Sequence, residues 1–204
     1  MKPYIALLAA ALIVSNSLAE TSTFDFKDPK GVNNVTFTLD APLESISGTT
    51  NGISGTITLD PENPTEVTGK IIVDAKSLRV PNAVMQDHML GDGWLDTEAH
   101  PEISFEVSEI LNRQKDGPSG TAEVTGVFSL KGISKKITAP VKVTYLPGRL
   151  ADRTGGSTEG DLLVVRTTFT FSRSEFGIKP GENLDKVSDT VTVSLAIAGA
   201  APKN

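Results

Sequence analysis

The sequence predicts an all-β fold built from eight antiparallel strands. Apolar and polar residues alternate with a period of two in segment after segment of the 204-residue chain, a pattern that places the apolar side chains on one face of an extended strand. Clusters rich in Gly, Pro, Asp and Asn separate the segments, and such residues bend a chain sharply. One stretch, between Arg79 and Pro101, departs from the alternation and has helical character.

Each predicted strand rests on its own alternation. In the first strand, threonines separate the apolar side chains of Val35, Phe37 and Leu39, and the other segments repeat the pattern. Pro140 has no backbone N–H, so it must occupy a bulge or an edge position in the sixth strand. The polar stretch 146–160 is predicted to be a mobile loop. In order, the eight segments are 35–39, 53–59, 67–75, 103–107, 122–130, 137–145, 163–171 and 191–197.

Alternation alone does not decide between a barrel and a sandwich, because both architectures bury one face of every strand. An eight-stranded barrel can enclose one small ligand. Small side chains on the inward face would leave room for such a guest, and they occur at Gly55, Gly69, Ala75, Ala122, Gly126 and Ala139.

Residues 82–90 are predicted to form a short helix. Asn82 is placed as its N-cap, and Gly91 follows the last helix-forming residue. Met85 and Met89 are one helical turn apart and give the helix a narrow apolar stripe. A helix of this length is expected to cross between two strands and to cover one end of the barrel.

The first 19 residues are typical of a secretory signal peptide cleaved after Ala19. The apolar run 5–14 is too short to span a bilayer comfortably, and no cysteine stands near the cut to carry a lipid anchor. The remaining chain, 20–204, fits the size of a single domain. With 0 Cys in the chain, an exported fold depends on its core and not on disulfides. We therefore expect a periplasmic or secreted protein.

Charge argues against nucleic acid as a partner. The formal net charge is −6, and the basic residues are scattered along the chain, so nothing favours binding to phosphates or to an anionic membrane surface. Beyond the leader, no apolar run is long enough to predict stable membrane insertion. The sequence leaves a homodimer open.

The two histidines do not form a recognisable metal motif. His88 and His100 are separated by twelve positions and match no zinc-binding helix pattern, and the nearby acids match no calcium loop. The chain also has no GxSxG nucleophile elbow. A metal-assisted hydrolase centred on Asp87, His88 and Asp96 is therefore a weaker alternative, and no catalytic residue, metal or cofactor is predicted.

Four motifs stand in a specific order along the chain. They are "QDHMLGDGWLDTEAHPEISFEV", "GVFSLKGISKKITAPV", "FSRSEFGI" and "VSDTVTVSLAI". In this order and spacing the chain resembles the YceI-like family of periplasmic and secreted lipocalin-like proteins, from about residue 23 to 198. The resemblance implies an eight-stranded antiparallel lipocalin-like barrel with a short helical segment capping one end. It also implies a long apolar tunnel that holds a polyisoprenoid or a similar lipid.

The resemblance places the ligand among the inward-facing side chains of the barrel and beside the helical segment. His88 would either tie the helix down or touch a polar head group. Arg173 would lie at the rim and hold a phosphate, or it would pair with a surface acid such as Glu175. Gln86 stands where the family usually has an arginine, a departure that affects head-group contacts more than the fold. The predicted ligand-binding residues are Phe37, Leu39, Ile71, Val73, Met85, His88, Met89, Trp94, Phe105, Phe128, Phe169, Phe171, Arg173 and Phe176.

The leading hypothesis from the sequence is an exported lipid-binding protein without enzymatic activity. It would hold a long apolar chain for transport, storage or sequestration, with that lipid as its ligand and no cofactor. Besides the hydrolase, a ligand-free β-sandwich that serves as an assembly module is the other alternative.

Overall fold

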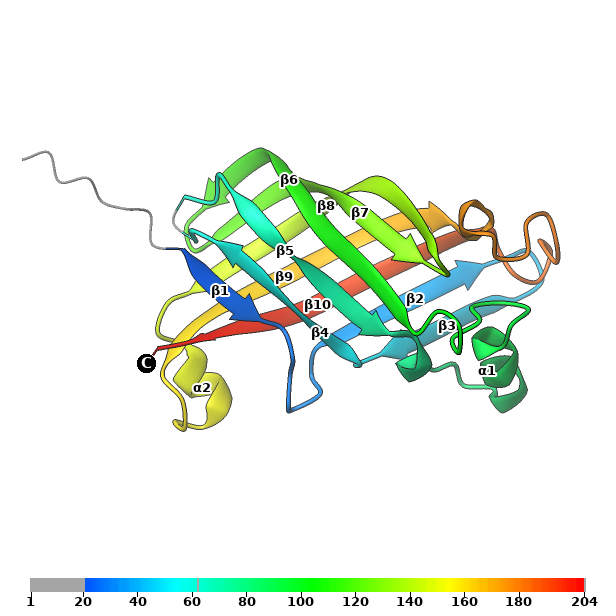
Figure 1. Ribbon diagram of the computed structural model, residues 1–204, viewed down its shortest axis with the longest axis horizontal. Coiled ribbons are helices and arrows are strands. Elements are labelled where there is room, and N and C mark those ends of the chain that lie inside the picture. The colour runs from blue at the N-terminus through cyan, green and yellow to red at the C-terminus, as the bar shows by residue number, and fades with distance from the viewer. Residues whose placement is uncertain (1–20, 62, 204) are drawn as a thin grey trace, which may run out of the picture.

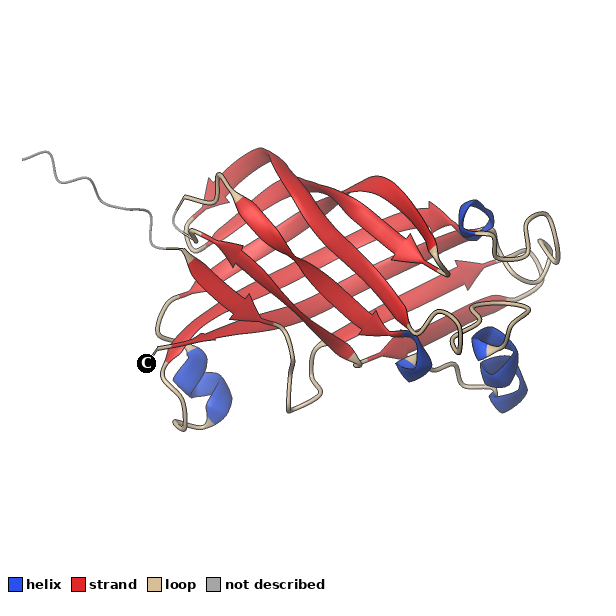
Figure 2. Ribbon diagram, viewed as in Figure 1, coloured by secondary structure: helices blue, strands red, loops and turns tan. Residues whose placement is uncertain are grey.

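The residues that the computed structural model describes, 21–61 and 63–203, form ten strands that close into an antiparallel barrel (Figures 1 and 2). Around the barrel the strands follow the order β1-β4-β5-β6-β7-β8-β9-β10, and β1 also pairs with β10, which closes the ring. The predicted signal peptide lies outside the described residues. The strands are β1 (Ser22–Asp25), β2 (Asn34–Asp40), β3 (Ser45–Thr50), β4 (Ile53–Leu59), β5 (Val67–Asp74), β6 (Glu102–Asp116), β7 (Ser119–Leu130), β8 (Ile133–Leu146), β9 (Gly160–Ser172) and β10 (Thr190–Pro202).

These ten strands occupy eight positions in the wall, because two positions each consist of two short strands. β10 pairs with β1 at Ala200 and with β2 from Ala196 to Thr192, so β1 and β2 follow one another along the same side of β10. In the next position β4 pairs with β1, and β3 pairs with β2. The closed ring confirms the predicted eight-stranded antiparallel barrel and contradicts the sandwich alternative.

A side chain bridges the break between β1 and β2. Asn33 is 3% exposed, and its Nδ2 donates to the carbonyls of Phe26 and Ala198 at 3.0 and 3.1 Å. Its Oδ1 accepts from the Ala198 N–H at 2.9 Å. Ala198 lies on β10 between the parts that pair with β1 and with β2. The Asn33 amide therefore replaces the backbone pairing that the strand break removes.

We expect Asn33→Leu to lower the free energy of unfolding by about 3 kcal/mol, because it leaves one buried and two partly buried backbone groups without partners, and an unsatisfied buried group costs about 1–3 kcal/mol. Urea denaturation measures the change. Asn34→Leu is the matched control, since the Asn34 side chain bonds only locally, to the Val32 carbonyl, among the contacts described. A loss below about 1 kcal/mol in Asn33→Leu would contradict the bridging role.

All eight predicted strands are present, and two short strands were not predicted. β1 has four residues, too few for an alternation to be recognised. β3 contains Gly48, which lies against the ring of Phe37: a Cβ added there would come within 2.2 Å of the ring, so Ile46 is the one apolar side chain on the inward face of β3. Pro140 pairs with β7 just before the β8–β9 ladder begins at Val141, which confirms its edge position.

Short helices lie at both ends of the barrel (Figure 1). Asn82 caps α1 as predicted, and its side chain accepts from the Met85 N–H at 2.9 Å. The stretch 146–160, predicted to be a mobile loop, contains α2, and Leu150 of this helix is 2% exposed. In the described ranges no helix has the length and apolarity needed to cross a membrane. The helices are η1 (Ala75–Ser77), α1 (Ala83–Leu90), α2 (Leu150–Thr154) and η2 (Arg173–Phe176).

The core consists of two apolar clusters. One includes Phe24 and Phe26, both 0% exposed, together with Leu163 and Ile197. The other surrounds Phe176, which is 1% exposed, and includes apolar residues of β7 and of the 91–95 segment. The two clusters leave a space between the inner faces of the strands, and this space is the candidate functional site.

Candidate functional site

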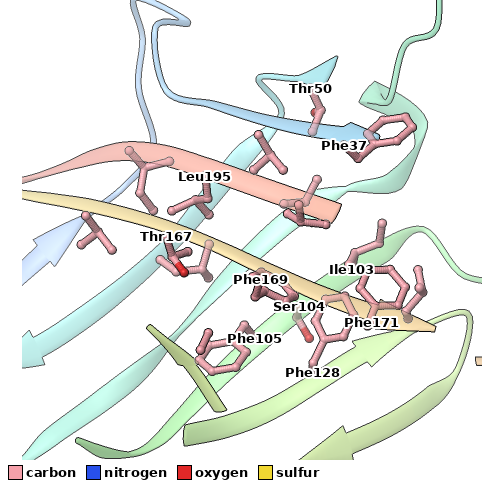
Figure 3. A pocket seen from close by; sticks show the side chains of 18 of the residues that line it. Phe37, Thr50, Ile103, Ser104, Phe105, Phe128, Thr167, Phe169, Phe171 and Leu195 are labelled. Carbon is pink, nitrogen blue, oxygen red and sulfur yellow. The ribbon is translucent and has the colours of Figure 1, made fainter. Parts of the chain in front are cut away.

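An apolar cavity of about 300 Å³ lies inside the barrel. It reaches from one core cluster to the other, since Phe26 and Leu163 of the first cluster and Phe128 and Ile178 of the second both line it. Figure 3 shows the labelled side chains converging on this space from strands on opposite sides of the barrel. Its size falls at the lower end of the range for small-molecule pockets.

Aromatic side chains form one wall of the cavity. Phe169 and Phe171 point inward from β9 because they stand two positions apart on a strand, and Phe105 and Phe128 are direct partners across β6 and β7. The Phe128 ring centroid lies 5.9 Å from that of Phe169 and 5.2 Å from that of Phe171. Edge-on and tilted packing of this kind forms a smooth apolar surface.

Few polar side chains reach the lining. The hydroxyls of two of them, Thr50 and Thr167, already have hydrogen-bond partners within the protein. The Thr50 hydroxyl lies 2.5 Å from the Ser77 hydroxyl, and the Thr167 hydroxyl donates to the Pro140 carbonyl at 2.6 Å. These groups have little capacity left for a ligand. The cavity is therefore suited to recognise apolarity and shape.

Arg173 lines the cavity but is not available to a head group. The residue is 1% exposed, and its guanidinium lies 5.5 Å from the centre of the Trp94 ring, a cation–π geometry. Its nitrogens donate to five backbone carbonyls, those of Ile178, Lys179, Glu182, Val187 and Ser188. Both predicted roles are thus corrected: Arg173 neither faces an open rim nor pairs with Glu175, which is 3.8 Å from Lys135.

Asp189 completes the anchoring of this loop. Its carboxylate accepts from the Ser174 N–H at 3.0 Å and from the Ser174 hydroxyl at 2.9 Å. Burial raises the pKa of Asp189, but the hydrogen bonds from Ser174 and the charge of Arg173 outweigh that effect and leave the pKa below its ordinary value. The 173–189 segment is therefore held at both of its ends.

Two further carboxylates hold the opposite end of the barrel in the same way. Asp28 forms a 2.8 Å ion pair with Arg153 of α2, and Asp161 accepts from the Tyr145 hydroxyl at 2.9 Å and from the Gly148 N–H at 2.7 Å. Burial raises both pKa values. Hydrogen bonds from backbone and side-chain donors, together with the charges of Arg153 near Asp28 and of Lys203 near Asp161, outweigh the effect of burial and lower the pKa of each carboxyl.

We expect the free energy of unfolding to change little between pH 7 and about pH 5 and to fall below about pH 4. A lowered pKa means that the folded state binds fewer protons than the unfolded state. The stabilisation is therefore complete above the unfolded pKa of about 4 and is lost as the pH falls through the folded values. Urea denaturation from pH 3 to 7 measures this dependence. Asp161→Asn should reduce the slope, and an unchanged slope would contradict the assignment.

The structure brings most of the predicted ligand-binding residues together. Eleven of the fourteen line the cavity: Phe37, Leu39, Ile71, Val73, Met89, Trp94, Phe105, Phe128, Phe169, Phe171 and Arg173.

Met85, His88 and Phe176 do not line it, and their predicted positions are corrected. α1 contains no buried residue; His88 is exposed and Met85 is half-buried, and neither is among the cavity-lining residues. Phe176 is fully buried behind the lining, where its ring packs against Phe128 and Phe171 at centroid distances of 5.3 and 5.4 Å.

Several lining residues were not predicted. Val141 and Val193 share the inward parity of their strands, so the alternation itself could have identified them. Phe26 follows a strand too short to be recognised. Ile110 could not have been found by counting, because β6 gains one residue between Val107 and Glu109 and the alternation reverses there.

The histidines do not assemble a metal site in the described part of the chain, where no group of three His, Cys, Asp or Glu side chains comes together. His100 packs against the β7–β8 turn, and a Cβ added at Gly132 would lie 2.8 Å from its ring. Gly132 has a positive φ of 74°. Glycine is therefore required here for two reasons: the backbone conformation, and the collision that a side chain would make with the His100 imidazole.

Comparison with curated proteins gives relatives that cover most of the chain. A UPF0312 protein of Pseudomonas putida (strain W619) is 31% identical over 161 residues, which are 78% of this chain and 75% of the relative. A UPF0312 protein of Pseudomonas aeruginosa (strain LESB58) is 28% identical over 152 residues, 74% of this chain and 72% of the relative.

Solved structures share the fold at lower sequence identity. The crystal structure of BcnA from Burkholderia cenocepacia has a TM-score of 0.65 at 20% identity and covers 81% of this chain and 95% of its own. A polyisoprenoid binding domain from Saccharophagus degradans, implicated in plant cell wall breakdown, has a TM-score of 0.65 at 14% identity. The match covers 90% of this chain and 100% of that domain. The model of the YceI-like domain matches residues 20–198. The chain therefore belongs to the YceI-like family.

Proposed function

We propose that this protein binds a polyisoprenoid or a similar long apolar lipid inside its barrel and does no chemistry on it. The observation that carries the proposal is the cavity itself. Its lining is apolar almost throughout, and the hydroxyls of Thr50 and Thr167 in the lining are hydrogen-bonded within the protein. Burying an apolar chain gains about 0.8 kcal/mol per CH₂. A lined cavity can therefore bind a lipid tightly without a specific polar contact.

The family relationship supports this proposal. The Saccharophagus degradans domain, which shares the fold, is described as polyisoprenoid binding. The engagement of Arg173 with five carbonyls argues that the head group is not held by this arginine. Selectivity would then depend on the length and shape of the apolar chain.

Export to the periplasm or the cell exterior is part of the proposal. The leader at residues 1–19 supports export. With 0 Cys in the chain, the exported fold would depend on its core and not on disulfides. In that compartment the protein would transport, store or sequester a water-insoluble lipid. No cofactor is needed for this role.

The hydrolase alternative gains no support from the geometry. Asp87 and His88 are exposed on α1, and Asp96 lies in the following turn, where its carbonyl accepts from the His100 N–H at 2.8 Å. We therefore propose no second function.

Native mass spectrometry of the full chain, purified without detergent from a bacterial periplasm, tests the proposal. We expect a lipid adduct, and solvent extraction should release an isoprenoid or another long-chain lipid. In a second measurement, delipidated protein is titrated with geranylgeraniol, and binding should be saturable. Recovery of adduct-free protein that also fails to bind geranylgeraniol and palmitic acid would contradict the proposal.

A further inference from the structure

The barrel wall is interrupted between β5 and β6. Their ladder runs from Asp74 paired with Glu102 to Lys70 paired with Glu106, and it ends there. β5 continues to Val67, but over these residues it pairs with β4. β6 continues to Asp116, paired with β7. In the described chain the two strands thus exchange no backbone hydrogen bonds beyond Lys70, although both go on as parts of the wall.

A β-bulge directs an apolar side chain to this interruption. Val107 pairs with Gly126 and Glu109 pairs with Thr125, so Ser108 is one extra residue on β6. A bulge of this kind changes which side chains face inward. Without it Glu109 would face the cavity; with it Ile110 does so. The Ser108 hydroxyl donates to the Thr125 carbonyl at 3.0 Å, which stabilises the bulge.

The cavity reaches the interruption from both sides. Val67 at the start of β5 lines it, and so do Val107 and Ile110 of β6. Val67 and Ile110 are half-buried, and both line the cavity. This part of the wall is apolar on both edges of the gap.

A second interruption, between β8 and β9, is closed by side chains. The β8–β9 ladder begins at Val141, leaving residues 133–140 of β8 without backbone ladder partners on β9. The buried Phe176 packs there against Phe128 and Phe171. The Lys135–Glu175 ion pair, at 3.8 Å, joins β8 to η2 across the same region.

Buried side chains pack toward both ends of the barrel. Toward one end Phe24 and Phe26, both 0% exposed, pack with Leu59 and Leu163. At the other end the Arg173 guanidinium binds five carbonyls of the 178–188 segment and stacks on Trp94. Opening either end would break buried contacts, whereas separating β5 from β6 beyond Lys70 breaks no ladder hydrogen bond.

We propose that the apolar ligand enters and leaves the cavity sideways, between β5 and β6, through a portal formed by Val67, Val107 and Ile110. This inference rests on the proposed lipid-binding function and adds the route to it. A lateral portal lets an apolar chain slide in while the ends of the barrel and the anchored 173–189 segment stay closed. The portal controls the rates of exchange more than the affinity.

Stopped-flow exchange of a fluorescent anthroyloxy fatty acid tests the portal. Val67→Trp places a bulky side chain in the gap, and we expect it to slow both association and dissociation about tenfold, with a much smaller change in Kd. Thr68→Trp is the matched control, since Thr68 is exposed on the outer face of the same strand and should leave both rates unchanged. Equal rates in the two variants would overturn the proposal.

A crosslink provides an independent test that does not depend on how the tryptophan packs. The chain has 0 Cys, so in a Val67→Cys/Ile110→Cys variant a short bifunctional thiol reagent joins only these two positions. Crosslinking should slow release of the bound probe about tenfold or more relative to the same protein left uncrosslinked. Release at the same rate in both forms would overturn the portal. Failure of the wild-type protein to bind the probe would instead contradict the proposed function, so the two failures are distinguishable.

Discussion

Replacing Arg173 by methionine is expected to lower the free energy of unfolding by about 4 kcal/mol. The guanidinium serves five backbone carbonyls, and each buried carbonyl left without a donor costs about 1–3 kcal/mol. Part of that cost is offset, because the variant no longer buries a charge. Urea denaturation followed by the fluorescence of Trp94, the single tryptophan of the chain, measures the change.

Two further variants separate the role of Arg173 from a general effect of losing an arginine. Arg166→Met removes an exposed arginine from β9, the strand that precedes Arg173, and should change the stability by less than about 0.5 kcal/mol. Arg173→Lys retains the charge, but an ammonium group has three donors and cannot reproduce the guanidinium geometry, so its stability should lie between those of wild type and Arg173→Met. A loss below about 1 kcal/mol in Arg173→Met would contradict the anchoring role.

Ala139→Trp is expected to weaken geranylgeraniol binding at least about 100-fold while the free energy of unfolding stays within about 1 kcal/mol of the wild-type value. Ala139 is 4% exposed and lines the cavity, so an indole group placed there would occupy ligand space. Displacing about four CH₂ groups of the lipid costs about 3 kcal/mol. Isothermal titration calorimetry and urea denaturation measure the two quantities.

The stability measurement also tests the cavity itself. In a filled core, a change from alanine to tryptophan costs about 1–3 kcal/mol or more through overpacking, whereas a cavity of about 300 Å³ can accept the ring. Lys136→Trp, on the exposed face of the same strand, is the control and should retain lipid binding. Unchanged geranylgeraniol affinity in Ala139→Trp would show that the lipid does not use this space.

The strands could be predicted from the sequence because their pattern is local. A strand that buries one face needs apolar side chains at every second position, and all eight segments with this pattern became strands of the barrel. The prediction did not extend to β1, which is too short, or to β3, where the ring of Phe37 fills the space that a side chain at Gly48 would need. Each of these two strands has a single apolar side chain, Phe24 in β1 and Ile46 in β3, which is too few for an alternation to be detected.

Lining residues of the candidate site were predicted where the strand alternates regularly. They were missed where a bulge or a short strand interrupts the alternation. Phe169 and Phe171 line the cavity because they share one face of β9. Ile110 lies beyond a bulge that reverses the alternation, so no count along β6 assigns it to the interior. Residues outside the strands were assigned less well, since Met89 of α1 lines the cavity and its neighbour His88 does not.

By itself the sequence determined the all-β class, eight of the ten strands and the face that each regular segment buries, because a period-two pattern has one way to bury its apolar side chains. The tertiary structure alone decided where the wall is interrupted and what Arg173 does. The carbonyls that Arg173 binds come from five to fifteen residues away along an irregular loop. Their convergence depends on the path of the backbone, which no side-chain pattern records.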